Sequence, residues 1–255
     1  MLESIKTEKE VIMTRLFAQE KLSDRNTIEL NEEDSRYISQ VLRMRPGEEV
    51  TVVDADGLEL ICEISEITKK QVTLNINNRR ENSSEPPFKV TLFQCVSKGE
   101  RMDLTVQKCT ELGVSSIVPV LSERCVVKMN AKDSKGKIDR WQKIALEASR
   151  QSGRGIVPKI EEPLPLEKAY ELISDYDLTI FPWEEETGKG LKSALQSFNG
   201  KNIAIFIGPE GGFSQKEADD AVDRGAIRVT LGPRILRTET AGAAVLAMII
   251  YESEI

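Results

Sequence analysis

The hydrophobic positions of the chain change their period near residue 80. Residues 45–76 alternate apolar and polar side chains, interrupted by the turn sequences PGE and DADG, a pattern typical of short paired strands. Upstream, residues 32–44 have the apolar spacing of a short amphipathic helix. We therefore expect a small β-rich domain over residues 13–80, after a leader of residues 1–12 and before a polar, proline-bearing linker at 81–88.

From residue 89 onward, apolar runs of strand length alternate with segments of helical periodicity. The runs are KVTLFQCV, SSIVPVLS, DLTIFPW, NIAIFIG and AIRVTLG. Helical spacing marks residues 101–114, 138–154, 214–224 and 238–253. Repeated units of a strand followed by a helix predict a parallel α/β sheet over residues 89–255.

Two loops that contain glycine and proline follow the last two predicted strands. GPEGG (208–212) comes directly after the apolar run IAIFI, and Ser214 with Glu217 forms a capping-box signature for the helix that follows. LGPRILRTETA (231–241) leads from the next strand into the C-terminal helix. Because parallel strands all end at one edge of a sheet, we expect both loops to lie at the edge where open α/β sheets bind ligands.

GPEGG does not have the sequence of a common phosphate-binding loop. It lacks the Gly-Lys-Ser/Thr ending of a triphosphate loop, and no GxGxxG follows any predicted strand, so nucleoside triphosphates and dinucleotides are poor candidates. Its three glycines would still let backbone groups approach a ligand closely, with Pro209 stiffening the approach. A tight turn without a ligand is the alternative for this loop taken alone.

The composition removes several kinds of catalytic site. The chain has no histidine, which excludes Ser-His-Asp and Cys-His nucleophilic schemes, so acid–base chemistry must use carboxylates, Lys, Tyr, Cys or the substrate itself. The four cysteines, at positions 62, 95, 109 and 125, form no CxxC pair. This spacing predicts free buried thiols and no metal site.

The formal net charge of −7 is distributed unevenly along the chain. Residues 1–78 carry 10 basic and 16 acidic side chains, residues 79–155 carry 15 and 9, and residues 156–255 carry 10 and 17. The middle segment could therefore present a basic surface to nucleic-acid phosphates, although solvated helix faces explain the same charges. The first twelve residues lack an apolar signal core, and the apolar stretch 241–250 is too short to cross a bilayer, so we expect a cytoplasmic protein.

Four motifs together resemble one known family. IGPEGGFS, LGPRILRTETA, KGERMDLTVQKCTELGV and EASRQSGR are similar to the bacterial 16S ribosomal RNA uridine-N3 methyltransferases of the SPOUT superfamily, and the similarity covers residues 13–255. The resemblance implies a small PUA-like RNA-binding β-barrel followed by a SPOUT α/β domain with a C-terminal trefoil knot. It also implies S-adenosylmethionine as donor, S-adenosylhomocysteine as product, 16S ribosomal RNA or the assembled small subunit as substrate, and a homodimer.

The same resemblance places the methyl donor between three loops, at residues 181–183, 208–212 and 231–241. Backbone groups would bind the adenine edge, and Leu231, Ile235 and Leu236 would supply apolar walls, with plain core packing as the alternative for the last two. The cofactor-binding residues implied in this way are Phe181, Pro182, Trp183, Gly208, Pro209, Gly211, Gly212, Leu231, Gly232, Ile235, Leu236, Arg237, Thr240 and Ala241.

Methylation of uridine N3 requires loss of a proton whose solution pKa is above neutral, so the site must stabilise the uridine anion or supply a base. Arg237 and Arg154 are the candidates for the first role, and Glu239 and Glu210 for the second. Alternatively, Arg237 binds phosphate, Glu239 favours a helix N-terminus, and Glu210 holds its loop. The residues expected to contact RNA are Arg15, Arg43, Lys98, Arg101 and Lys108.

Two features depart from the family pattern. Members commonly carry histidine before the VLR motif, where this chain has RYISQ (36–40), so an RNA contact there would be made differently. A leader also precedes Met13, which is an alternative start. Two other functions stay open: a SPOUT methyltransferase that acts on transfer RNA or on a ribose hydroxyl, and a catalytically silent RNA-binding protein, against which the intact loop pair argues.

Overall fold

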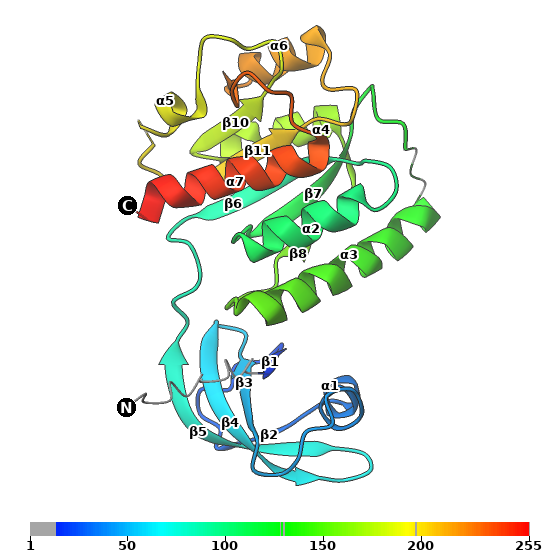
Figure 1. Ribbon diagram of the computed structural model, residues 1–255, viewed down its shortest axis with the longest axis vertical. Helices are drawn as coiled ribbons and strands as arrows, with labels where there is room; N and C mark the ends of the chain where they lie inside the picture. The colour runs from blue at the N-terminus through cyan, green and yellow to red at the C-terminus, as the bar shows by residue number, and fades with distance from the viewer. Residues whose placement is uncertain (1–13, 128, 130, 197, 255) are drawn as a thin grey trace, which may run out of the picture. The chain divides into compact units, whose positions relative to one another are not determined.

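The computed structural model of the chain describes residues 14–127, 129, 131–196 and 198–254. The chain divides into two compact units, residues 1–83 and residues 84–255, and the division falls inside the segment expected to be a linker. The expected leader, residues 1–12, lies outside the described residues. Figure 1 shows the helices and strands of each unit.

The N-terminal unit is a five-stranded sheet with strand order β1-β3-β4-β5-β2. Strand β1 runs parallel to β3, and the other pairs are antiparallel. The helical segment expected at 32–44 begins with Asn31, whose side chain accepts a hydrogen bond from the Asp34 N–H, and its second turn is π-helical. The elements are β1 (Thr14–Phe17), β2 (Thr27–Glu29), α1 (Glu32–Arg36), the π-helix Tyr37–Val41, β3 (Glu49–Val53), β4 (Leu58–Ile67) and β5 (Val72–Glu81).

The C-terminal unit is built on a parallel sheet with strand order β12-β10-β11-β6-β7-β8, and β9 also pairs with β7. All five strands expected from the sequence are present. Its strands are β6 (Lys89–Cys95), β7 (Ser116–Leu121), β8 (Lys159–Ile160), β9 (Leu164–Pro165), β10 (Leu178–Pro182), β11 (Asn202–Ile207) and β12 (Ile227–Val229). Its helices are α2 (Arg101–Glu111), α3 (Ala131–Ser152), α4 (Leu166–Glu171), the 3-10 helix Ile173–Asp175, α5 (Leu191–Leu195), α6 (Gln215–Asp223) and α7 (Thr238–Glu254).

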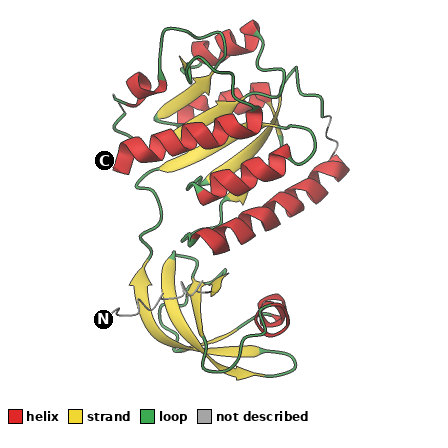
Figure 2. Cartoon of the chain, viewed as in Figure 1, coloured by secondary structure: helices red, strands yellow, loops and turns green. Residues whose placement is uncertain are grey.

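Helices cover both faces of the parallel sheet, which is why its strands are apolar on both sides (Figure 2). Along β11, Ile205 faces a core shared with α2, α3, α5 and α7, whereas Phe206 faces a second core shared with α4 and α6. This alternation follows from the two-residue period of a strand. Helix α7 lies beside α2 and crosses β6 and β11 (Figure 1).

Local sequence signals set several of the helix ends. Ser214 and Glu217 form the expected capping box, in which each side chain accepts a hydrogen bond from the other residue's N–H. Helix α6 ends at Asp223, and Gly225, just beyond its C-cap residue, has φ 103°. The mixed N-terminal sheet and the parallel C-terminal sheet confirm the expected fold class. Strand order alone does not decide whether the C-terminal segment is knotted, so the trefoil knot stays a prediction.

Candidate functional site

Three loops meet at the carboxyl edge of the parallel sheet. They follow β10, β11 and β12, which are neighbours in the strand order, so the chain segments 182–187, 207–213 and 230–241 come together as expected (Figure 1). They enclose a cavity of about 900 Å³, a size typical of small-molecule sites. Its lining is Arg101, Pro182, Trp183, Glu184, Glu186, Thr187, Ile207, Gly208, Pro209, Glu210, Gly212, Phe213, Thr230, Leu231, Gly232, Pro233, Arg234, Ile235, Leu236, Arg237, Thr238, Glu239 and Ala241.

A chain of hydrogen bonds ties the second and third loops to the sheet. Gln94, fully buried on β6, donates from Nε2 to the Thr238 hydroxyl at 2.9 Å, and that hydroxyl donates to the Gly208 carbonyl at 2.6 Å. On the other side of the second loop, Arg124 donates from Nη1 to the Gly211 carbonyl at 2.9 Å. The loops are therefore held in place by residues far away in the sequence.

The glycines of GPEGG have different structural roles. Gly212 has φ +66°, and a Cβ there would lie 2.6 Å from a carboxylate oxygen of Glu184, so only glycine fits without rearrangement. A Cβ at Gly208 would meet the Phe213 ring at 3.2 Å. A Cβ at Gly211 would make only an ordinary contact with Arg124 at 3.5 Å, and Gly211 does not line the cavity. The expected cofactor contact at Gly211 is therefore not supported.

Eleven of the fourteen expected cofactor-binding residues line the cavity, and Phe181, Gly211 and Thr240 do not. Phe181 is fully buried and packs against Phe206 and Phe213, so other core residues cover its side chain. Thr240 lies on the exposed side of the first turn of α7. Neither residue therefore lines the cavity, because Phe181 is covered in the core and Thr240 lies on the exposed side of its helix.

Four charged side chains expected to take part in RNA binding or catalysis line the cavity, and three of them lie close together. Glu210 Oε1 accepts hydrogen bonds from the Lys98 N–H at 3.0 Å and from Arg101 Nη1 at 2.5 Å. Glu239, in the first turn of α7, lies with Oε2 4.0 Å from Arg101 Nε and has a side chain 12% exposed. Arg237 is exposed at the cavity just before α7 begins.

The two carboxylates differ in their capacity to act as a base. Burial acts to raise the pKa of Glu210, but the hydrogen bonds from the Lys98 N–H and Arg101 outweigh it and hold the pKa below its ordinary value. A carboxylate stabilised in this way is a weak base at neutral pH, so Glu210 fits the loop-holding role. Glu239 carries no such set of hydrogen bonds in the described part of the chain, and it is the better candidate base.

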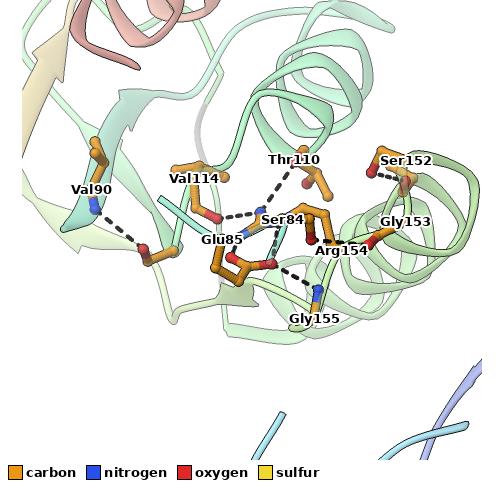
Figure 3. Close-up of polar contacts among 11 residues, drawn as sticks. Ser84, Glu85, Val90, Thr110, Val114, Ser152, Gly153, Arg154 and Gly155 are labelled. Carbon is orange, nitrogen blue, oxygen red and sulfur yellow. Dashed lines mark hydrogen bonds and ion pairs between the residues drawn. The ribbon is translucent and has the colours of Figure 1, made fainter. Parts of the chain in front are cut away.

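Arg154 is not part of this site. It is 2% exposed, and it donates from Nε to Glu85 at 3.0 Å, from Nη2 to the other Glu85 oxygen, and from Nη1 to the Thr110 and Val114 carbonyls at 3.1 and 2.6 Å (Figure 3). Glu85 also accepts from the Gly155 N–H at 2.8 Å. The guanidinium joins the start of this unit to the ends of α2 and α3. The expected catalytic role of Arg154 is therefore wrong, because the side chain is buried away from the cavity.

The expected RNA contacts also lie in different surroundings. Arg15 is buried and forms an ion pair with Glu59 at 2.8 Å, which does not support a phosphate contact. Lys108 is paired with Glu111 on α2. Lys98 and Arg43 are exposed, and Arg43 has φ 56°.

Sequence reasoning missed some residues of the site for different reasons. Glu184 adjoins the FPW segment and Thr238 lies inside LGPRILRTETA, so the motifs themselves could have indicated both residues. Gln94 gave no local signal, because its bond to Thr238 spans 144 residues. Arg101 was assigned to RNA phosphates, whereas the structure places it in the cavity wall.

The remaining expectations concern cysteines, metals and membranes. All four cysteines are free; Cys62, Cys95 and Cys109 are buried and Cys125 is partly buried. Within the described ranges, no group of three or more acidic, cysteine or histidine side chains could hold a metal ion. No helix among the described residues has the length and apolarity needed to span a bilayer.

Comparison with known proteins places the chain in a family. A family model described as an RNA methyltransferase domain matches residues 84–250, and one described as an RNA methyltransferase PUA domain matches residues 30–77. The chain is 32% identical over 251 residues to the ribosomal RNA small subunit methyltransferase E of Bacillus subtilis (strain 168), covering 95% of this chain and 98% of that protein.

Two solved structures agree with this match. One is a ribosomal RNA small subunit methyltransferase E from Neisseria gonorrhoeae bound to S-adenosyl methionine, 34% identical with TM-score 0.83, covering 93% of this chain and 96% of that one. The other, from Legionella pneumophila, is described as a methyltransferase in complex with SAM; it is 32% identical with TM-score 0.84, covering 94% and 98%. The chain therefore belongs to the RNA methyltransferase family of the ribosomal RNA small subunit methyltransferase E proteins, which confirms the resemblance seen in its sequence.

Proposed function

We propose that this chain methylates N3 of a uridine in 16S ribosomal RNA, with S-adenosylmethionine as the donor and S-adenosylhomocysteine as the product. The observation that carries the proposal is the cavity at the sheet edge, where the carboxylate of Glu239 lies 4.0 Å from the Arg101 guanidinium and Arg237 also lines the wall. The names of the relatives, which are ribosomal RNA methyltransferases, support the substrate class.

The cavity residues fit this donor. S-adenosylmethionine has an adenine ring, a ribose, a charged amino acid end and a cationic sulfonium. Ile207, Leu231 and Leu236 supply apolar surface, and Gly208, Gly212 and Gly232 bring the backbone to the cavity wall. The indole Nε1 of Trp183 is buried with no hydrogen-bond partner among the described residues, and a donor in the wall of a cavity calls for an acceptor on a ligand.

The bound donor would supply an electrophilic methyl group, and the chain's own residues would prepare the uridine. Glu239 accepts the N3 proton. Arg237 faces the negative charge that develops on the base, and the N-terminus of the 17-residue helix α7 adds a favourable dipole there. The nitrogen then attacks the methyl carbon directly, so no covalent enzyme intermediate is needed.

Methylation assays test this function directly. Purified chain should transfer labelled methyl from S-adenosylmethionine to small-subunit RNA, and mass mapping of RNA from a deletion strain should show one uridine without its N3 methyl. Assays on naked 16S ribosomal RNA and on assembled subunits decide between the two substrates. Methyl transfer to transfer RNA or to a ribose hydroxyl would replace this proposal, and donor binding without transfer to any RNA would indicate a silent homologue.

We also propose that the chain acts in the cytoplasm as a homodimer. Exposed apolar side chains on neighbouring helices support a self-association surface: Met248 (45%) and Tyr251 (66%) on α7, and Leu104 (43%) on α2. Light scattering at micromolar concentration should report twice the chain mass. A monomer that is fully active at that concentration would rule out the obligate dimer.

A further inference from the structure

Arg101 lies at the boundary between the loop cavity and an adjoining groove, a position that the sequence does not predict. It is the first residue of α2, and it lines both the loop cavity and an adjoining groove of about 740 Å³. The groove is otherwise lined by Lys98, Gly99, Glu100, Asp103, Leu104, Gln107 and Ile144. Arg101 therefore lies at the boundary that the loop cavity and the groove share.

The surroundings of Arg101 are those of a positioned catalytic cation. Its side chain is 41% exposed, so it is partly withdrawn from solvent. Nη1 is fixed by the hydrogen bond to Glu210 at 2.5 Å, and Nε lies 4.0 Å from Oε2 of Glu239, the proposed base. No other polar partner of Nε or Nη2 is found among the described residues, so these donors can serve a ligand.

We propose that Arg101 is a catalytic residue that binds a carbonyl oxygen of the uracil and stabilises its anion; this inference rests on the proposed function. Uracil N3 carries a proton and is flanked by two carbonyl oxygens. A carboxylate and a guanidinium held side by side can therefore meet the N3–H and a neighbouring carbonyl at the same time. Arg101 takes the place in the reaction that the sequence analysis gave to Arg154.

The step balances with these groups. The N3–H bond breaks and its proton moves to Glu239, while the electron pair stays on the base and is shared with the two carbonyl oxygens, one of them bound by Arg101. The N3 pair then forms the bond to the donor's methyl carbon, and the electrons of the broken carbon–sulfur bond remain on sulfur. Arg101 acts by holding the charge that exists between these two events.

The same pair of groups would select the base. Cytosine N3 has no proton to donate to Glu239, and its exocyclic amine presents a donor where uracil presents an acceptor. In one orientation of cytosine, the amine N–H groups would therefore face the N–H donors of Arg101, and no hydrogen bond could form. A site that binds a specific polar edge rejects a base that leaves its polar groups unpaired. The Arg101 and Glu239 pair thus accounts for preference for uridine over cytidine.

The test compares Arg101→Ala and Arg101→Lys with Arg224→Ala, a control that removes an arginine of the same unit which does not line the cavity. Single-turnover methylation is measured at saturating RNA and donor across pH. Donor affinity is measured by calorimetry without RNA, and RNA affinity is measured over a salt series. Far-ultraviolet circular dichroism checks that each variant is folded. If Arg101→Ala does not fold, Arg101→Lys, which keeps the positive charge, is used in its place.

For Arg101→Ala we expect the rate at neutral pH to fall about 10²–10³-fold, the loss typical of removing one donor to a developing anion. The loss should shrink as pH rises toward the pKa of uridine N3, because the base then ionises without help. Arg101→Lys should recover part of the rate, since lysine keeps the positive charge but lacks the planar set of guanidinium N–H donors. Donor affinity and the salt dependence of RNA binding should match those of Arg224→Ala.

Three outcomes overturn the inference. A salt slope lowered by about 0.9 with the saturated rate intact would make Arg101 a phosphate contact. Collapse of donor affinity with a normal rate at saturating donor would make it a support for the Glu210 loop. An unchanged rate in Arg101→Ala, with an active wild-type chain, would remove Arg101 from the reaction and leave the proposed function standing; an inactive wild-type chain would instead refute the function itself.

Discussion

Replacing Arg154 by alanine should lower the free energy of unfolding of the C-terminal unit, while the rate of methyl transfer by the folded protein stays nearly unchanged. The guanidinium is 2% exposed and serves Glu85 and the Thr110 and Val114 carbonyls (Figure 3). Removing one partner of a buried ion pair costs about 3–5 kcal/mol, because the other charge stays buried and unpaired. The Glu85 side chain is 25% exposed and can be partly rehydrated, which places the expected loss near the lower end, at about 3 kcal/mol.

Urea denaturation followed by tryptophan fluorescence reports the unfolding of the C-terminal unit, since both tryptophans, Trp141 and Trp183, lie in it. With a denaturant slope of about 2 kcal/mol per molar urea, a loss of about 3 kcal/mol lowers the midpoint by about 1.5 M. Lys168→Ala is the control, because Lys168 forms an exposed pair with Glu171, and such pairs contribute about 0–1 kcal/mol.

The two roles considered for Arg154 give opposite results. The structural role predicts the lowered midpoint, with single-turnover methylation within a few-fold of wild type at temperatures where the variant is folded. An unchanged midpoint combined with a rate lowered about 10²-fold, the loss expected for a catalytic donor, would refute the reasoning and return Arg154 to the reaction.

Gly212→Ala should lower the free energy of unfolding by about 1–2 kcal/mol in urea denaturation, because the left-handed backbone costs a non-glycine residue about that much; Gly211→Ala should not, and equal effects would contradict the assignment. Lys98→Ala should lower the slope of log RNA affinity against log salt by about 0.9, whereas an unchanged slope would move the phosphate contacts elsewhere. Cys125 should be alkylated by iodoacetamide at pH 7 well before Cys95: the hydrogen bond from Cys95 lowers the pKa of Cys125 to about 6, so its thiolate predominates above that pH, while burial raises the pKa of Cys95. Equal labelling of the two thiols by mass spectrometry would contradict this.

The sequence by itself determined the fold class and the place of the site. The change from alternating to strand-and-helix periodicity separates two units, and the apolar runs give five strands of the parallel sheet. Because parallel strands end at one edge, the loops that follow β10, β11 and β12 had to meet there. These features depend on neighbours within a few residues, and local periodicity records such neighbours faithfully.

Only the tertiary structure decided which side chains line that site. Phe181 and Trp183 are two residues apart and belong to the same buried cluster, yet only Trp183 also lines the cavity. The surroundings of Arg154 and Arg101 also come from distant residues: Arg154 meets Glu85 across 69 residues, and Arg101 meets Glu210 across 109. The partner of a charged side chain is set by packing between distant elements, and no periodicity along the chain specifies which distant carboxylate a guanidinium will meet.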